Sequence, residues 1–174
     1  LDSDREKIKS YLLSKGIQSN EVVFSAVNFN KDFDYIYNEN GSTKQQIFTG
    51  FNLTQTVTVQ SKDVNKIEDI SRQSSELINS GVEFYSNAPE YYYTKLAELK
   101  IKMIAEATKD ARVRAQSIAE NAGAGLGHLK KSDMGVFQIT GQNSSEDFSY
   151  GGSFNTMSKN KTANITVKLV YQVD

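Results

Sequence analysis

Few residues in this chain have the type and spacing that catalysis or metal binding requires. The 174 residues include one histidine, His128, and no cysteine. Disulfides, thiol catalysis, Cys-ligated metals and multi-histidine sites are therefore excluded. No serine stands in a nucleophile-elbow pattern. We expect His128 to be structural or exposed, with a general base as the alternative, and we expect no catalytic residue and no metal site.

Two short segments resemble ligand-binding motifs without meeting their requirements. The glycines of GAGLG at 123–127 follow a predicted helix, whereas a dinucleotide fingerprint follows a strand and opens a helix. We expect Gly123 to end that helix in the left-handed conformation. The segment NKDFD at 30–34 begins like a calcium loop, but Tyr35 stands where the loop needs glycine and Gly41 where it needs glutamate. No cofactor is expected.

Aromatic and charged residues are the better candidates for function. Phe33, Tyr35 and Tyr37 alternate in a predicted hairpin, and aromatic side chains are common at binding hot spots as well as in cores. Arg112 and Arg114 lie on the longest predicted helix. Asp110 can pair with Arg114 at i, i+4, or an arginine can dock a partner. These five aromatic and arginine residues are the candidate interaction residues: Phe33, Tyr35, Tyr37, Arg112 and Arg114.

The pattern of apolar residues predicts the elements that position these candidates. We expect helices over 3–15, 63–79 and 90–122, and strands over 21–30, 45–60, 82–85, 129–140 and 163–173. Asn40-Gly41 suits a hairpin turn. The apolar stripe of the long helix should lie flat on a sheet; it comprises Leu96, Leu99, Met103, Ala107, Ala111, Ala115, Ile118 and Ala122.

The order α-β-β-α-β-α-β-β predicts an α+β fold, mainly an antiparallel sheet with helices packed on it. One strand placed before the first helix would complete a split βαβ core, so this core is expected to lack its first strand. The length suits a single domain over 1–174. Residues 141–160 are rich in Gly, Ser and Asn and predict a mobile loop, anchored by Phe148 and three other apolar residues.

Composition argues against two classes of partner, nucleic acids and a membrane that the chain would span. The net charge of −1 argues against nucleic-acid binding, which normally uses a basic face. No apolar run is long enough to span a membrane. The chain opens in a helical pattern without an initiator methionine. We therefore expect an N-terminally trimmed product of a longer precursor.

Three stretches together resemble the SIMPL-domain family. They are YLLSKGIQSNEV at 11–22, the Gly50-Phe51 pair within 47–67, and AEATKDARVRAQSIAENAGAGLGHL at 105–129. The resemblance implies an exported envelope protein, periplasmic or outer-membrane-associated, whose signal peptide this chain lacks. Members normally carry a strand and a helix start before the point where this chain begins. The family has no agreed catalytic residues.

The resulting hypothesis is a non-enzymatic cell-envelope protein that acts through self-assembly or an envelope protein partner. Two alternatives stay open. One is an enzyme with an unrecognised carboxylate or tyrosine site, and the other is an intracellular kinase-adaptor-like signalling protein, as in the family's eukaryotic branch. Strand edges left unpaired by the missing strand, or the aromatic hairpin, are the expected routes to self-association.

Overall fold

The computed structural model describes residues 1–145 and 149–174 and divides the chain into two units. Unit 1 covers Leu1–Pro89 and unit 2 covers Glu90–Asp174. The named strands form four two-stranded ladders, all of them antiparallel. The α+β class and the predicted order of elements are confirmed, with several long strands divided in two. The single domain over 1–174 and the split βαβ core stay predictions.

Unit 1 combines three α-helices and one short 3-10 helix with two ladders. Its elements are α1 (Asp2–Ser14), η1 (Ser19–Glu21), β1 (Val22–Phe24), β2 (Asn28–Tyr37), β3 (Thr43–Thr54), β4 (Val57–Val59), α2 (Val64–Gln73) and α3 (Ser75–Asn79). Helix α1 ends where glycine was expected: Gly16 has a φ of 80°, and the backbone N–H of Ile17 donates to the Leu12 carbonyl at 3.0 Å. Leu12 and Ile17 are buried, as are Leu77 and Val82, so the core of this unit lies around its helices.

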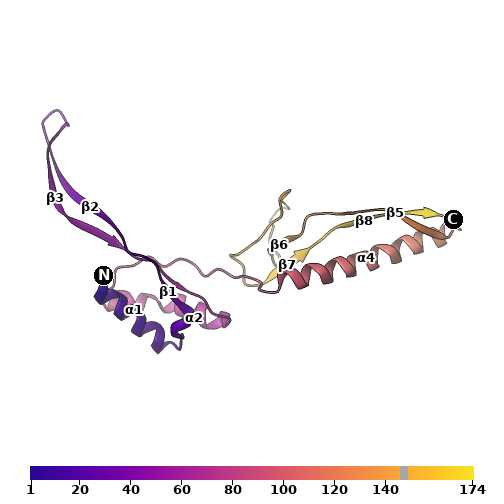
Figure 1. Ribbon diagram of the computed structural model, residues 1–174, viewed down its shortest axis with the longest axis horizontal. Helices are drawn as coiled ribbons and strands as arrows, with labels where there is room; N and C mark the ends of the chain where they lie inside the picture. Colours follow the sequence, from indigo (N-terminus) through magenta and orange to yellow (C-terminus); the bar gives the residue numbers. More distant parts are fainter. Residues whose placement is uncertain (146–148) are drawn as a thin grey trace. The chain divides into compact units, whose positions relative to one another are not determined.

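The hairpin β2–β3 projects from the helices of unit 1 (Figure 1). Its turn is closed by the backbone N–H of Asn38, which donates to the Ser42 carbonyl at 2.8 Å. Gly41 has a φ of 78°, which glycine adopts without the steric cost of a side chain. The predicted Asn40-Gly41 turn is therefore confirmed. At the other end, β1 and β4 continue the same two chain segments as a short ladder beside the helices.

The predicted short strand at 82–85 is not formed. Val82 is buried, and its backbone N–H closes the end of α3 by donating to the Leu77 carbonyl at 3.1 Å. Within the described chain no strand pairs with 82–85. A strand needs a neighbour for its N–H and C=O groups, and without one this segment is irregular.

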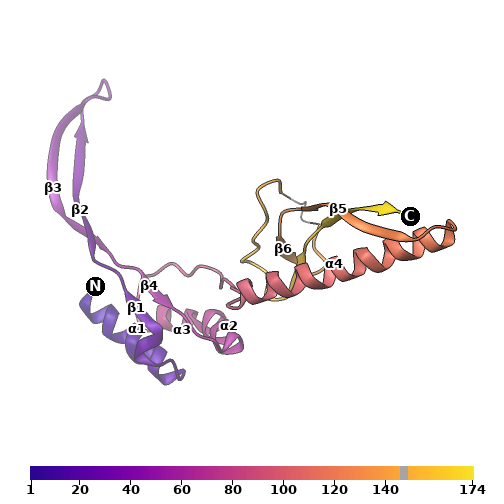
Figure 2. The ribbon, with the colours of Figure 1, turned by 45° about the vertical axis from the view of Figure 1, so that its right-hand side comes forward.

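Unit 2 is built on one long helix, α4 (Leu96–Asn121), which lies along a two-stranded ladder (Figure 2). The strands of unit 2 are β5 (Leu126–Met134), β6 (Gln138–Gly141), β7 (Lys161–Asn164) and β8 (Val167–Val173). The ladder along α4 is β5–β8, and β6 pairs with β7. The helix starts six residues later than the predicted position 90. The backbone N–H of Tyr91 donates to the Thr156 carbonyl at 2.7 Å, and residues 91–95 form a loop and a turn instead of the first helical turns.

The inward stripe of α4 follows the prediction over most of its length. Ala107, Ala111 and Ala115 are half-buried, as expected for small residues that let a helix approach a sheet. The last turn differs, because Ala119 is 4% exposed whereas Ile118 is 72% exposed. The helix therefore keeps a four-residue step from Ala115 to Ala119, and the predicted three-residue step to Ile118 is wrong.

Strand β6, which pairs with β7, is buried along its whole length. Phe137, Gln138, Ile139 and Thr140 are all buried. The backbone N–H of Ile139 donates to the Ser153 carbonyl at 2.6 Å, and the Gln138 amide donates to the Ser149 carbonyl at 2.8 Å. Described parts of the predicted loop 141–160 thus lie on β6. Its mobility stays a prediction, and its expected anchor Phe148 lies outside the described residues.

The turn after α4 is fixed by the last residue of the chain. Gly123 has a φ of 76°, which confirms its role at the helix end. The backbone N–H of Gly125 donates to the Asp174 carbonyl at 2.8 Å, and the Asp174 N–H donates to the Gly125 carbonyl at 3.0 Å. The glycines of 123–127 therefore serve a turn that pairs with the end of β8.

Candidate interaction surface

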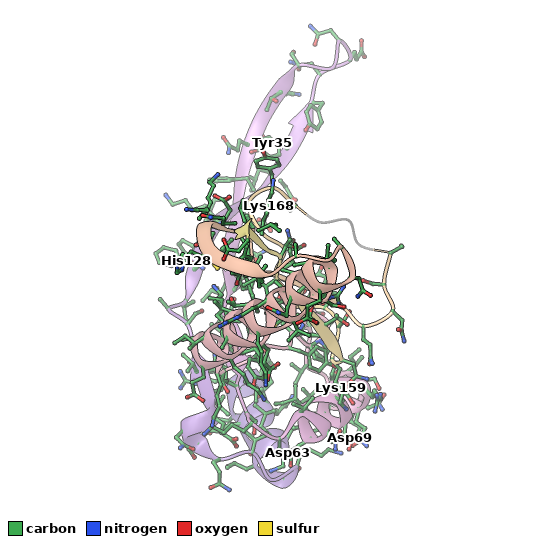
Figure 3. The ribbon with its side chains drawn as sticks, turned by 90° about the vertical axis from the view of Figure 1, so that its right-hand side faces the viewer. Tyr35, Asp63, Asp69, His128, Lys159 and Lys168 are labelled. Atoms are coloured by element: carbon green, nitrogen blue, oxygen red, sulfur yellow. The ribbon has the colours of Figure 1, made fainter. Side chains whose placement is uncertain are left out.

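The hairpin β2–β3 carries an aromatic face. Alternate residues of a strand point to the same side, and the register pairs Phe29 with Leu53 and Phe33 with Phe48. We call this surface the aromatic face; it comprises Phe29, Phe33, Tyr35, Tyr37, Phe48, Phe51 and Leu53. The predicted candidates Phe33, Tyr35 and Tyr37 all belong to it. Figure 3 marks Tyr35 on the hairpin.

A β-bulge brings Phe48 and Phe51 to the same side. Three residues apart, they would point to opposite sides of a regular strand. The register passes from the Asp32–Gly50 pair to the Phe33–Phe48 pair, so Thr49 is an extra residue on β3. Gly50 has a φ of 153°, a conformation that side-chain-bearing residues rarely adopt. The two rings lie 5.3 Å apart, measured between centroids.

Ring contacts link the members of the aromatic face. Phe51 also contacts Phe29, with centroids 6.2 Å apart, and Phe48 contacts Phe33 at 5.7 Å, each pair edge-to-face. Nearer the tip, Tyr35 and Tyr37 are stacked at 6.4 Å. Edge-to-face and offset-stacked pairs are the favourable arrangements of aromatic rings. The rings therefore form two clusters, four phenylalanines and two tyrosines, along one side of the hairpin.

The opposite side of the hairpin is mostly polar. We call it the polar face; it comprises Asn28, Asn30, Asp32, Asp34, Ile36, Gln45, Ile47, Asn52 and Thr54. Lys31 stands on the aromatic face, because its register partner is Phe51, and Gln46 there donates to the Tyr35 hydroxyl at 3.3 Å. Asn30, Asp32 and Asp34 alternate along an extended strand, so they do not form the loop that calcium coordination needs.

Most of the aromatic face is open to solvent. Phe29 is 67% exposed, Tyr37 60% and Phe51 54%, and Phe33 is half-buried. Single exposed apolar residues are normal on proteins, whereas contiguous apolar patches mark interaction sites. The aromatic face is therefore the strongest candidate for a binding surface in the described residues.

The two predicted arginines lie elsewhere, on α4 in unit 2. Both are exposed. Arg114 Nε lies 2.9 Å from Asp110 Oδ2, the i, i+4 pair expected from the spacing. Residues two apart on a helix point about 200° away from each other, so Arg112 and Arg114 do not share one surface. A partner-docking role for either stays a prediction.

Unit 1 also contains an open groove of about 650 Å³ between α1 and α3, which we call the polar groove because most of the residues that line it have polar side chains. Burial raises the pKa of Tyr11 above its ordinary value; Lys15 partly opposes this and Glu76 adds to it. Lys15 Nζ lies 2.9 Å from Glu76 Oε2, and Lys7 Nζ donates to the Ser80 carbonyl at 2.9 Å. The groove is lined by Ser3, Glu6, Lys7, Ser10, Tyr11, Ser14, Glu76, Leu77 and Ser80.

His128 lies exposed on β5 (Figure 3), one of the two roles expected for it. Over residues 1–145 and 149–174, no three carboxylate or histidine side chains come together as a metal site would need. The same ranges include no helix with the length and apolar character to cross a membrane.

Comparison with known proteins places the chain in a family without an assigned activity. No curated protein sequence matches it. The family described as "SIMPL: Protein of unknown function (DUF541)" matches residues 1–171, which spans both units and nearly the whole chain. The three stretches that suggested the resemblance all lie within this range, and the chain belongs to the SIMPL family.

Proposed function

We propose that this chain is part of a non-enzymatic cell-envelope protein, periplasmic or outer-membrane-associated, that acts by binding other protein surfaces. The observation that supports it is the aromatic face of the β2–β3 hairpin. Exposed aromatic rings held on a twisted two-stranded ladder offer a large, rigid contact area at little cost in side-chain entropy. The envelope location is inferred from membership of the SIMPL family, because the resemblance to that family implies an exported protein.

The polar groove is the rival site, and it would support the enzyme alternative. Its charged groups already have partners within unit 1: Lys7 donates to the Ser80 carbonyl, and Glu76 pairs with Lys15, which lies outside the groove lining. Burial raises the pKa of Tyr11 above its ordinary value, which disfavours the tyrosinate that a general base would need. This arrangement favours helix packing over catalysis, and we assign no reaction to the groove.

Site-specific photo-crosslinking in the producing cells tests the binding role. A photoreactive side chain at Tyr37 lies on the aromatic face, and one at the adjacent Ile36 lies on the polar face of the same strand. Both positions are substantially exposed, at 60% and 44%. We expect protein adducts from position 37 and few from position 36. Equal yields at the two positions, or none at 37, would contradict a binding role for this face.

Fractionation of the same cells tests the location. The proposal expects the protein in the envelope fractions. Recovery with the cytosol would reject the envelope assignment and favour the kinase-adaptor-like alternative.

Substitutions Tyr11→Phe and Glu76→Gln in the groove test the enzyme alternative. A cellular defect caused by these two, and not by loss of Phe48 and Phe51, would favour catalysis.

A further inference from the structure

We propose that the occupant of the aromatic face is the same face of a second copy of this chain. This inference rests on the proposed binding role and names the partner. The two hairpins would pack face to face, about 10 Å apart as stacked sheets do, with their polar faces outward. Three properties of the hairpin support a second copy: its apolar face lacks a cover, its exposed area suits a dimer, and Lys31 lies among the rings.

A two-stranded hairpin is marginally stable in water unless a helix or another sheet covers one face. In unit 2 the ladder β5–β8 has such a cover in α4. In unit 1 the hairpin β2–β3 extends beyond the helices (Figure 1), and its apolar side chains are open to solvent. The hairpin thus has the side chains of a covered ladder without a cover from the described elements of its own unit.

The exposed area is close to what a specific dimer needs. Phe29, Tyr35, Tyr37, Phe48, Phe51 and Leu53 each expose between 47% and 67% of their surface. Aromatic side chains bury roughly 150–250 Å² when covered, so this face offers about 600 Å² per copy. Specific interfaces bury about 800 Å² per partner, and stable ones start near 600 Å². The face therefore suits a reversible dimer at the low end of stable interfaces.

Lys31 decides how the two copies are related. It is the charged residue whose register position places it among the rings, beside Phe51. A two-fold axis along the strands would put both Lys31 side chains at the same level of the interface. An axis across the strands at Phe33 separates them by four residues, about 14 Å along the strand, which exceeds the screening length of roughly 8 Å at physiological salt.

The crossed axis also gives each Lys31 a partner. It places position 31 of one copy opposite position 35 of the other, so the ammonium group meets the Tyr35 ring, a favourable cation–π arrangement. Phe29 then lies opposite Tyr37, and Phe33 opposite Phe33. Lys31 of each copy thus lies opposite an aromatic ring of the other copy. The face is therefore complementary to itself, as a two-fold interface requires. This matching favours a second copy over an unrelated protein or a lipid surface.

Sedimentation of the 174-residue chain over a range of concentrations tests the dimer. We expect a concentration-dependent monomer–dimer equilibrium. Phe48→Ser combined with Phe51→Ser should weaken it by about tenfold or more, because central aromatics dominate interface energies. The matched control is Ile36→Ser with Ile47→Ser on the polar face, where side chains 44% and 41% exposed are also truncated. This control should leave the dimer within about twofold of the parent.

Crosslinking tests the register with single substitutions. Because the chain has no cysteine, each introduced thiol is unique. A bis-maleimide spanning about 10 Å, the sheet separation, should join Phe33→Cys to itself. It should also join Lys31→Cys to Tyr35→Cys in a mixture more efficiently than either variant to itself. Asp34→Cys, on the polar face, should crosslink at background yield.

The possible outcomes separate this inference from the proposed function. A chain that stays monomeric, or a dimer that survives the Phe48/Phe51 variant, overturns the second copy as occupant. If photo-crosslinking at Tyr37 still captures another protein, or vesicles of anionic lipid bind the aromatic face, the face has a different occupant. If neither dimer nor adduct forms, the inference and the proposed binding role fail together.

Discussion

The ladders β2–β3 and β5–β8 differ in what covers them. Both are antiparallel pairs interrupted by register shifts. Along β8, inward Val167, Leu169 and Tyr171 are half-buried, whereas Lys168 and Val170 between them are exposed. Along β2, nine of ten residues are exposed whichever way they point. The difference is the helix α4, which lies against β5 and β8.

In these two ladders, the alternation of apolar side chains along a strand and the burial of those side chains have different causes. Period-two alternation places apolar side chains on one face of a strand, but burial needs a second element on that face. In unit 2 the second element is local in sequence, because α4 immediately precedes β5. In unit 1 the helices α1 and α3 contact each other, and the hairpin extends beyond the helices (Figure 1), so the apolar face of the hairpin stays open. An uncovered face of this kind is the physical basis of the proposed binding role.

The largest expected difference between the two units comes from matched isoleucines. Ile139 in β6 is 5% exposed and Ile47 in β3 is 41% exposed. Ile139→Ala should lower the free energy of unfolding by about 2–4 kcal/mol, the range for buried aliphatic truncations. Ile47→Ala should cost under about 1 kcal/mol, because surface changes are usually small. Chemical denaturation measures both, and equal losses would show that the polar face of the hairpin, which carries Ile47, is covered in solution.

Overpacking the cover of unit 2 is the next test. Ala111 is half-buried on α4, and a leucine there should push the helix from the ladder and cost about 1–3 kcal/mol. Ala115→Leu should behave alike. The control is Ala105→Leu on the exposed side of the same helix, with an effect within about 0.5 kcal/mol. Unchanged denaturation midpoints for both inward variants would mean that α4 does not cover the ladder.

The bulge in β3 offers a way to disturb the uncovered ladder. Gly50 has space for a methyl group, since nothing lies within 4 Å of a Cβ placed there, but its φ of 153° disfavours any side chain. Gly50→Ala should therefore cost about 1–2 kcal/mol through backbone strain alone. It should also weaken the NMR cross-peaks between the Phe48 and Phe51 rings.

Gly151→Ala is the control for this change, because Gly151 also has open space and lacks the unusual φ. Its effect should be near zero. Persistence of the Phe48–Phe51 cross-peaks in the Gly50 variant would show that the bulge does not depend on glycine.

Local sequence signals were sufficient for much of the fold. The Gly16 and Gly123 helix ends, the Asn40-Gly41 turn and the small-residue stripe through Ala115 are each fixed by residues within a few positions. What failed depends on distant partners. Residues 82–85 have strand-like alternation but no neighbouring strand. The choice between Ile118 and Ala119 depends on how α4 meets the end of its ladder.

The candidate surface was found in part for the same reason. Phe33, Tyr35 and Tyr37 alternate in one strand, so the sequence showed that they share a face. Phe48 was missed because alternation counted from Phe51 assigns it to the other side, and only the bulge reverses this. The Gly50-Phe51 pair was the available signal, since glycine inside a strand often marks a bulge.

The smallest expected effect concerns a polar junction in unit 1. The Glu21 carboxylate accepts hydrogen bonds from the Ser61 hydroxyl and from the Gln18 backbone N–H, the latter at 2.9 Å. The Ser61 hydrogen bond, followed by that of Gln18, holds the pKa of Glu21 below its ordinary value of 4.5. Glu21 stands where η1 enters β1, and Ser61 follows β4. The β1–β4 ladder is thus joined partly by a group that titrates.

The direction of the pH effect follows from the lowered pKa. A carboxyl group that ionises more readily when folded stabilises the fold above its unfolded pKa, and this contribution is lost as the pH falls through the lower folded pKa. Acidification below 4.5 should therefore lower the amide protection factors of β1 and β4 more than those of β5 and β8, where apolar packing by α4 does not titrate. Ser61→Ala should raise the pKa of Glu21 toward 4.5, which NMR titration of the Glu21 carboxyl carbon measures. Glu21→Gln should abolish the pH dependence of amide protection in β1 and β4. An unchanged pKa of Glu21 in the Ser61 variant would show that this hydroxyl does not hold the junction. The contrast between the units would then rest on the apolar cover alone.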